Sequence, residues 1–239
     1  MKHRGIVSRP IRPLRALRAM RALLADPDDT SQVFLIIRAL SGNSFERLFQ
    51  RVDADPTGHR LLDEKRDLLP VLQDRESLRA LPNGTLGREY VRFLDRERIS
   101  PEGLVDASAE EDPPVYLDER ARIFGLRLRD MHDLWHVVTG YKRDLFGEAA
   151  LLAFTYAQTR NHGVGFIVMV ALLRQLHDGH REAMRLTWAA WQRGRRAESF
   201  PAADWEALLP QPLARVRTIL KVEDLPSYTP LFSKAAPVH

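Results

Sequence analysis

Apolar side chains recur along this chain at intervals of three and four residues, the spacing that places them on one face of an α-helix. The pattern is clear over residues 85–98, 148–160 and 180–197. Residues 164–176 are apolar on nearly all sides, which predicts a central core helix or one wall of an apolar cavity. No stretch alternates as a half-buried strand would. We therefore predict an all-α, bundle-like single domain with a central apolar helix.

Capping residues predict where two of the early helices begin. Asp55 followed by Pro56 indicates a helix start, because proline is favoured in the first turn. Asn43 and Glu46 fit a capping box for a helix over residues 44–52.

The middle of the chain changes composition. Residues 99–114 are rich in proline and acidic side chains, which predicts a linker that crosses the surface. A helix is expected over 116–129, with Gly125 as a candidate interruption. This helix carries four arginines that either balance the acidic linker or attract a substrate carboxylate: Arg120, Arg122, Arg127 and Arg129.

The first 25 residues combine basic and apolar positions. Arginines recur every third residue from Arg12, and beside them runs the apolar series Leu14, Leu17, Met20 and Leu23. A helix with these two faces suits an anionic membrane surface, or it docks on the core by its leucines, and both alternatives stay open. In a mitochondrial protein the same segment would be typical of a transit peptide.

Composition excludes several classes of protein. The 239 residues contain no cysteine, so disulfides and thiolate metal sites are excluded. The net charge is +4, but the basic residues alternate with acids and no nucleic-acid-reading motif is present, so we expect no nucleic-acid partner. The longest apolar run, residues 164–173, is shorter than the roughly 20 residues that a membrane span needs. No signal-peptide pattern is visible at the N-terminus.

Candidate chemistry is concentrated in the stretch MHDLWHVVTGYKRDLFGEAA, residues 131–150. His132 and His136 are four apart, so on one helix both rings can bind one metal, although such a pair can also be a chance feature of a helix surface. Gly140 is expected to end that helix, and a second helix that begins near Glu148 would bring its carboxylate back across from the histidines. Imidazole and carboxylate are ligands of zinc and of non-haem iron.

Other residues near this stretch are assigned smaller roles. A metalloprotease needs a glutamate between the histidines, where this chain has the shorter Asp133, so that class is excluded. Tyr141 and Asp144, in the connecting turn, are candidates for orienting the ligands. Four further histidines are expected at the surface or at helix ends: His59, His162, His177 and His180.

The run HDLWHVVTGY, with Glu148 at its fixed distance, resembles the signature of the coenzyme Q biosynthesis protein 4 family. The stretch LPNGTLGREYVRFL, residues 81–94, is similar to the family's segment upstream of that signature. Asp26 and Pro27 leading into VFLIIRALSG are similar to its start. The resemblance covers roughly residues 23–220.

The resemblance implies a division into a basic N-terminal segment (1–25), one helical metal-binding domain (26–225) and a poorly ordered tail (226–239). His132, Asp133, His136 and Glu148 are then the expected metal ligands and catalytic residues, with Asp133 completing or orienting the set. The metal is expected to be zinc, with Fe(II) as the alternative, because the ligand set suits both.

The implied function is the removal of the C1 carboxylate from a polyprenylated 4-hydroxybenzoate in ubiquinone biosynthesis. The step is either a plain decarboxylation or is coupled to hydroxylation. The alternative is a non-catalytic, lipid-binding scaffold that organises a ubiquinone biosynthesis complex at the membrane. A metallohydrolase, suggested by the His-Asp dipeptide, lacks the further ligands it needs.

The resemblance also implies partners and a location. The expected partners are the prenylated precursor or an isoprenoid lipid, other ubiquinone biosynthesis enzymes, a membrane surface and a second copy of the chain. The expected location is the cytoplasmic face of a bacterial inner membrane, bound peripherally, or the matrix side of the mitochondrial inner membrane in a eukaryote. An isoprenoid tail favours the cavity interpretation of residues 164–176.

Overall fold

The structure, a computed structural model, describes residues 10–26, 29–103, 118–224 and 226–232. Every regular element within these residues is a helix, and one isolated antiparallel bridge joins Thr85 to Pro212. The all-α prediction is therefore confirmed. Most of the linker expected over 99–114 lies outside the described residues, as do the first nine residues of the N-terminal segment and residues 233–239 of the expected tail.

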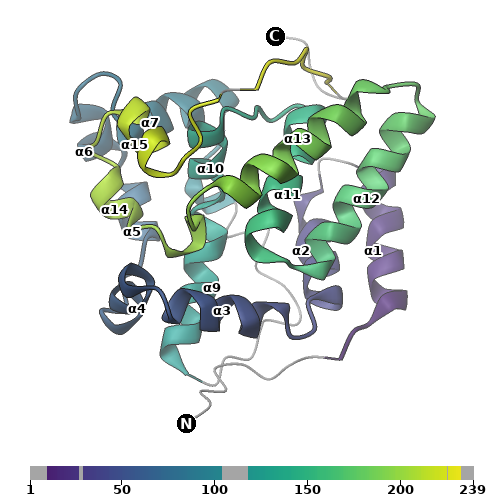
Figure 1. Cartoon of the computed structure of the whole chain (residues 1–239), viewed down its shortest axis with the longest axis horizontal. Helices are drawn as coiled ribbons and strands as arrows, with labels where there is room; N and C mark the ends of the chain where they lie inside the picture. Colours follow the sequence, from purple (N-terminus) through teal and green to yellow (C-terminus); the bar gives the residue numbers. More distant parts are fainter. Residues whose placement is uncertain (1–9, 27–28, 104–117, 225, 233–239) are drawn as a thin grey trace.

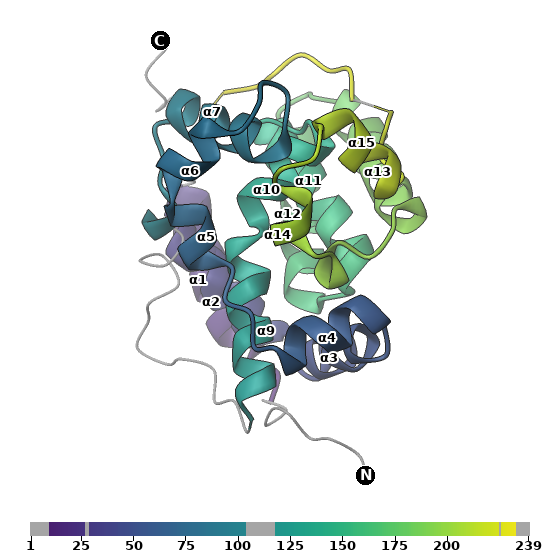
Figure 2. The ribbon, with the colours of Figure 1, turned by 90° about the vertical axis from the view of Figure 1, so that its left-hand side faces the viewer.

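The helices are joined by short connections, and Figures 1 and 2 label them in chain order. The N-terminal half contains α1 (Pro13–Ala25), α2 (Thr30–Leu40), α3 (Ser44–Asp53), α4 (Pro56–Asp63), α5 (Leu69–Gln73), α6 (Arg75–Ala80) and α7 (Leu86–Glu97). The C-terminal half contains α9 (Glu119–Asp130), α10 (His132–Thr139), α11 (Leu145–Thr159), α12 (His162–His177), α13 (Glu182–Arg196), the 3-10 helix η1 (Phe200–Ala202), α14 (Trp205–Leu208) and α15 (Leu213–Ile219).

The arrangement places α10 in the middle of the molecule. In Figures 1 and 2, α1 and α2 pack beside α12, and α3 and α4 pack beside α9. Helix α10 continues upward from α9 and contacts α7 and α15 as well as α11, which itself packs closely on α13. The helix that carries both candidate histidines therefore has neighbours from both halves of the chain.

Aromatic side chains fill the largest core cluster, next to α10. The Trp135 ring lies 6.1 Å from the Phe154 ring and 5.2 Å from the Phe200 ring, between centroids. The Phe200 ring meets the Trp205 ring at 5.5 Å. All four side chains are buried, and edge-on aromatic packing of this kind adds to the stability that burial alone provides. One face of α10 is thereby anchored, which leaves its other face for polar side chains.

The apolar helix predicted at the centre is at the periphery instead. Helix α12 packs on α2, α11 and α13, but Met169 and Leu173 on its outer side are 50% and 59% exposed. The expected central position is therefore wrong, and the buried centre is formed by α10 and α11. Uniform apolar character did not distinguish these helices, because it cannot show which faces find a partner.

The predicted helix ends were confirmed in part. The Asp55 carboxylate accepts hydrogen bonds from the backbone N–H groups of Thr57 and Gly58, as expected of an N-cap. The capping box is wrong: Asn43 makes no side-chain cap, and the Glu46 carboxylate accepts from Gln50 instead. Helix α9 runs through Gly125 without interruption, since the core packing of its buried neighbours offsets the roughly 1 kcal/mol that glycine costs in a helix.

Helix α1 docks on the domain, but not by the series of leucines that the sequence suggested. Ala16, Ala19 and Met20 are buried where α1 packs against α2. Leu14 and Leu17 point outward and are 72% and 42% exposed. The described part of the segment therefore combines both alternatives: one face is docked on the domain, and an apolar edge remains exposed beside the arginines.

Candidate metal centre

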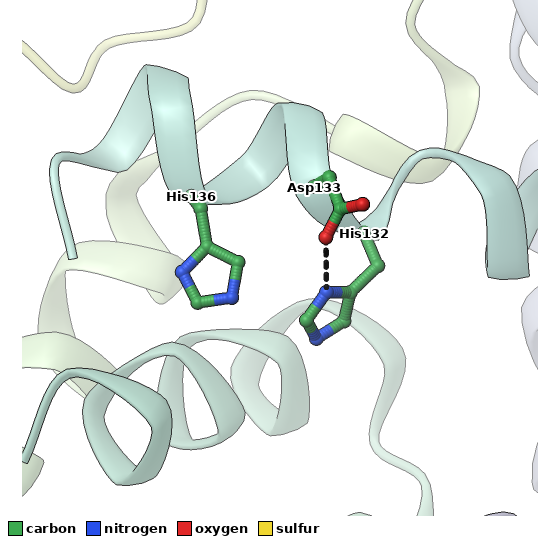
Figure 3. A group of neighbouring side chains, drawn as sticks. All are labelled: His132, Asp133 and His136. Carbon is green, nitrogen blue, oxygen red and sulfur yellow. Dashed lines mark ion pairs between the residues drawn. The ribbon is translucent and has the colours of Figure 1, made fainter. Parts of the chain in front are cut away.

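Helix α10 begins directly after α9 and ends at Gly140, whose φ of 79° is the left-handed conformation that glycine adopts readily. Because His132 and His136 are one turn apart, both rings project from the same side of α10, as Figure 3 shows. Their centroids are 5.0 Å apart. Donor atoms of His132, Asp133 and His136 all lie within 4.8 Å of one another, which is close enough for one ion to contact all three.

The His136 ring is held in one orientation. Its Nδ1–H donates to the backbone carbonyl of Tyr141 at 2.9 Å, which leaves Nε2 as the atom with a free lone pair. The side chain is buried, and the Phe93 ring stacks on it at 5.6 Å. Metal-binding histidines usually donate their second N–H in this way, because the bond fixes both tautomer and ring plane. The predicted orienting role of Tyr141 is performed by its backbone carbonyl.

Glu148 lies across from His136. The chain turns after Gly140, and α11 begins at Leu145, slightly earlier than predicted, with the Asp144 carboxylate as its N-cap. An Oε1 atom of Glu148 is 3.4 Å from His136 Nε2. Gly147 is needed here, because a Cβ at this position would lie 2.0 Å from the Lys142 carbonyl oxygen. All four sequence-predicted site residues are therefore neighbours.

Electrostatics link the facing groups. Burial acts to raise the pKa of Glu148, but His136, His132 and Arg143 outweigh it and lower the pKa to about 2. Burial acts to lower the pKa of His136, but Glu148 and Asp133 outweigh it, so that pKa is raised. A proton is therefore favoured between the imidazole and the carboxylate, at the place where a metal ion would compete for both.

The donor set suits a divalent metal. His136 Nε2 and His132 Nδ1 are buried and find no hydrogen-bond partner in the described part of the chain. The nearest acid to His132 Nδ1 is Asp133, at 3.6 Å (Figure 3). Buried nitrogen atoms without partners are costly, and imidazole and carboxylate donors together match zinc and non-haem iron. The side chains of His132 and Glu148 are about one third exposed, so one side of the site faces solvent.

Comparison with known proteins assigns the chain to a family. The family model described as "Coenzyme Q (ubiquinone) biosynthesis protein Coq4" matches residues 12–226. The chain belongs to the Coq4 family. Two relatives, the mitochondrial ubiquinone biosynthesis proteins of Aspergillus flavus and Yarrowia lipolytica, are each 30% identical over 183 residues and 75% of this chain. These matches cover 61% and 67% of the two relatives, and the chain spans about three fifths of the Aspergillus protein.

A solved structure supports the Coq4 fold. A Nostoc punctiforme protein, provisionally described as a ubiquinone biosynthesis protein, superposes with a TM-score of 0.69 over 90% of this chain and 100% of its own. At 22% identity this likeness shows the fold alone. Among the described residues of the present Coq4 family member, no helix is long and apolar enough to cross a bilayer.

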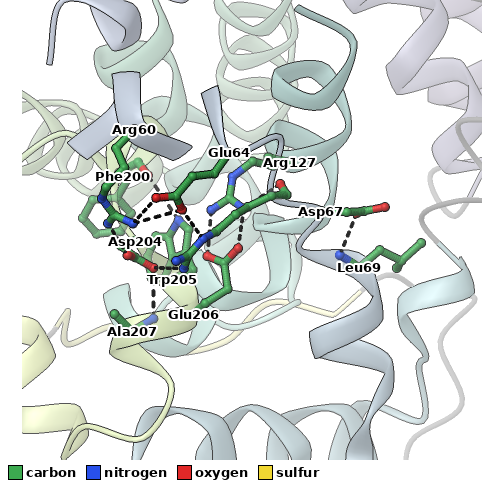
Figure 4. A network of polar contacts seen from close by, with 11 residues as sticks. Arg60, Glu64, Asp67, Leu69, Arg127, Phe200, Asp204, Trp205, Glu206 and Ala207 are labelled. Atoms are coloured by element: carbon green, nitrogen blue, oxygen red, sulfur yellow. Dashed lines mark hydrogen bonds and ion pairs between the residues drawn. The ribbon is translucent and has the colours of Figure 1, made fainter. Parts of the chain in front are cut away.

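The four arginines ahead of the Coq4 site are engaged elsewhere. Arg127 forms a two-pronged ion pair with Glu206, shown in Figure 4, and its second contact is 2.9 Å long. Arg120 pairs with Asp53 and Asp63, Arg122 with Glu119, and Arg129 with Asp130. They bind acids of the described helices, so none is an open anion receptor. His59, expected to stand alone, bridges Asp53 and Asp63 at 2.8 and 3.1 Å.

The cation that does face the site was missed by sequence reasoning. Arg143 Nε lies 3.6 Å from Glu148 Oε1, and the Arg143 side chain is one third exposed. Its position in the turn before α11 carries no periodic signal. The predicted helix pair placed Glu148 near the histidines, but the same geometry could also have placed this turn residue beside Glu148.

Part of the expected tail is docked over the same turn. The Tyr228 hydroxyl donates to Asp144 Oδ2 at 3.0 Å and accepts from the Lys142 backbone N–H. The Leu231 N–H donates to Asp144 Oδ1 at 3.0 Å. The prediction of a poorly ordered tail is therefore wrong for residues 226–232. Asp144 supports the start of α11 and this strap, rather than contacting the metal-binding groups.

Proposed function

We propose that this Coq4 family member is a metal-dependent enzyme of ubiquinone biosynthesis that removes the C1 carboxylate of a polyprenylated 4-hydroxybenzoate. The observation that carries the proposal is the cluster of His132, Asp133, His136 and Glu148, in which two buried imidazole nitrogens have no hydrogen-bond partner among the described residues. A residue cluster of this kind in a partly open site is typical of a functional metal centre.

In this proposal, His132, His136 and Glu148 bind a divalent metal directly, and Asp133 completes or orients the set. Zinc is the expected metal and Fe(II) the alternative. When bound, zinc supplies Lewis acidity toward a carboxylate, whereas Fe(II) additionally supplies the redox chemistry that a hydroxylating reaction needs. Plain decarboxylation releases CO₂ and places a proton on C1, and the hydroxylating version consumes oxygen and places a hydroxyl group there.

Arg143 is assigned the substrate carboxylate. Its guanidinium lies at the exposed side of the site, beside Glu148, and its terminal nitrogens make no hydrogen bond to any described residue. Guanidinium matches a carboxylate with two parallel hydrogen bonds. A metal on Glu148 would weaken the present 3.6 Å contact and leave Arg143 available for the substrate. Buried His136 holds its fixed ring beneath this exposed side.

The apolar tail and the membrane are assigned to the outer face of the α12–α13 pair. Met169, Leu173, Met184 and Trp188 are each at least half exposed there. Exposed apolar side chains on neighbouring helices fit a lipid or an isoprenoid better than water. Peripheral attachment to the bacterial inner membrane or the mitochondrial inner membrane follows as a proposal, as do contacts with other ubiquinone biosynthesis enzymes and with a second copy.

The decisive experiment is turnover of a prenylated 4-hydroxybenzoate by purified protein, metal-free and then reloaded with zinc or Fe(II), with and without oxygen. Product only with Fe(II) and oxygen indicates oxidative decarboxylation, and product with zinc alone indicates a simple lyase. Absence of product under every condition, with metal tightly bound, contradicts catalysis and favours the lipid-binding scaffold.

The ligand assignment has its own test, which does not depend on turnover. His132→Ala and Glu148→Ala should each lose bound metal, with affinity reduced by more than the roughly 10–100-fold typical of changes beyond the ligands themselves. The matched control is His177→Ala, an exposed histidine on α12. Circular dichroism should show an unchanged helix content. Metal retained in both site variants would show that the ligands are wrongly assigned.

A further inference from the structure

The end of α10 is held by a buried arginine from α13. Arg193 is only 6% exposed, and its Nη1 donates to the Thr139 carbonyl oxygen at 2.7 Å. Its Nη2 donates to the Val222 carbonyl oxygen, also at 2.7 Å. The guanidinium carbon lies 5.5 Å from the centre of the Tyr141 ring. One side chain thus contacts the chain on both sides of Gly140, and neither of these contacts involves a metal-binding group.

A second arginine, from α15, completes the capping of the helix. Arg217 Nε donates to the Val138 carbonyl oxygen at 2.9 Å, and its Nη2 donates to the Val137 carbonyl oxygen at 3.1 Å. The last carbonyls of a helix have no partner within it and carry partial negative charge, so cations stabilise that end. Together Arg193 and Arg217 satisfy three of them, and the fourth accepts from the Gly140 N–H.

The two arginines differ in what they touch beyond the helix. Arg217 contacts carbonyl groups of α10 only, whereas Arg193 also packs on Tyr141. The Tyr141 carbonyl is the group that accepts the His136 Nδ1–H bond. A residue that holds the turn from Thr139 to Tyr141 therefore holds the acceptor that orients the His136 ring.

We propose that Arg193 is a positioning residue for the metal centre. It clamps the turn after α10 so that the Tyr141 carbonyl fixes the tautomer and ring plane of His136. The planar guanidinium is required, because it reaches two carbonyls in different directions while its face lies on an aromatic ring, which a lysine ammonium cannot do. The inference rests on the proposed metal centre, and it adds a residue 57 positions from His136 to the machinery of the site.

The test compares Arg193→Met with Arg217→Met. Both variants lose hydrogen bonds to the same helix end and should lose stability, but only the first releases Tyr141. Zinc affinity, measured by competition with a chelator, should fall by about 10–100-fold in Arg193→Met, the range for groups that orient metal ligands. It should change by less than about threefold in Arg217→Met, whose contacts end at the helix.

A second readout is independent of metal. In metal-free protein, ¹⁵N NMR of the His136 ring reports whether Nδ1 carries the proton and whether that proton is hydrogen-bonded. The signal of the Nδ1–H bond should disappear or shift in Arg193→Met and persist in Arg217→Met. Arg193→Lys, which keeps the charge but not the fork, should resemble Arg193→Met, and it carries the same comparison if the methionine variant does not fold.

The outcomes separate this inference from the proposed metal centre. Equal loss of zinc affinity in the Arg193 and Arg217 variants would show that both act through helix stability alone and would overturn the positioning role. An unchanged His136 ring signal in a folded Arg193 variant would overturn it as well. If wild-type protein binds no metal, the proposed centre fails, and the ring signals alone decide whether Arg193 orients His136.

Discussion

Two regions of this protein depart from the usual division of side chains between core and surface, and they do so in opposite directions. The α10–α11 region buries polar side chains: Asp133, His136, Thr139 and Asp144 are each at most 4% exposed. The outer face of α12 and α13 exposes apolar ones, of which Leu173 is 59% exposed and Trp188 is 56% exposed. Buried polar groups and exposed apolar patches are the observations that carry information about function.

The difference lies in how each region is supported. Around α10, buried polar atoms have defined partners, such as the Tyr141 carbonyl for His136 Nδ1, and the exceptions point toward Glu148 and Asp133. On the outer face of α12 no described element covers Met169 or Leu173. The first region is a preorganised centre with a place for an ion, and the second is a surface whose complement is another apolar phase.

The largest expected effect tests the burial side of this comparison. Phe154 on α11 is fully buried against Trp135 and Phe200, so Phe154→Ala should reduce the free energy of unfolding by about 3–5 kcal/mol. Leu173→Ala on α12 should change it by no more than about 0.5 kcal/mol. Urea unfolding measures both. A large loss from Leu173→Ala would mean that the outer face of α12 is covered, and the comparison would collapse.

The next effect concerns lipid. Replacing Met169 and Leu173 by serine removes two exposed apolar side chains, each worth roughly 1.5–3 kcal/mol when fully buried. Binding to vesicles of anionic lipid should therefore weaken by about tenfold or more, as seen by co-sedimentation, while metal content stays unchanged. Gln192→Ser, at an exposed polar position on α13, is the control. Salt should also weaken wild-type binding, because arginines of α1 lie at the surface.

A smaller effect is expected at the open side of the metal centre. Arg143→Gln should raise the dissociation constant of a 4-hydroxybenzoate-type ligand by about tenfold, the loss of one charge-assisted contact of roughly 1.5 kcal/mol. Binding of the corresponding neutral amide should be unchanged, as calorimetry can show. Lys142→Gln, at the neighbouring exposed position, should leave both affinities unaltered. Equal weakening for the acid and the amide would argue against a carboxylate contact.

The smallest effect is a pH dependence in a polar network that belongs to neither region. Burial acts to raise the pKa of Asp204, but hydrogen bonds from Arg60 and the Ala207 N–H outweigh it, so the pKa lies below 3.8 (Figure 4). Because the folded state holds the depressed value, the carboxylate stabilises the fold above pH 3.8 and loses this contribution as the pH falls through the lower value.

Thermal melting should therefore show Asp204→Asn to be less stable than wild type at neutral pH, by about 1 kcal/mol or less, with the difference shrinking in acid. Metal content should not change at any pH above this range. A difference that grows as the pH falls would have the wrong sign for a depressed pKa.

The sequence by itself determined the local features of this protein. The three- and four-residue spacing of apolar positions specified helices, Asp55 and Gly140 marked a beginning and an end, and the spacing of His132 and His136 placed two rings on one face. These features follow from backbone geometry within one or two turns, so no distant contact was needed to predict them. Glu148 was also within reach, because a short turn has few ways to bring two helices together.

Only the tertiary structure decided the rest. It placed α12 at the periphery although its sequence is as apolar as a core helix, and it set Arg193 and Arg217 against the carbonyls at the end of α10. It also docked Tyr228 over the turn that precedes α11. Each of these results depends on which faces meet across large separations along the chain, and local periodicity carries no record of that choice. The physical reason is that burial and capping are satisfied by any suitable neighbour, and the fold selects which one is present.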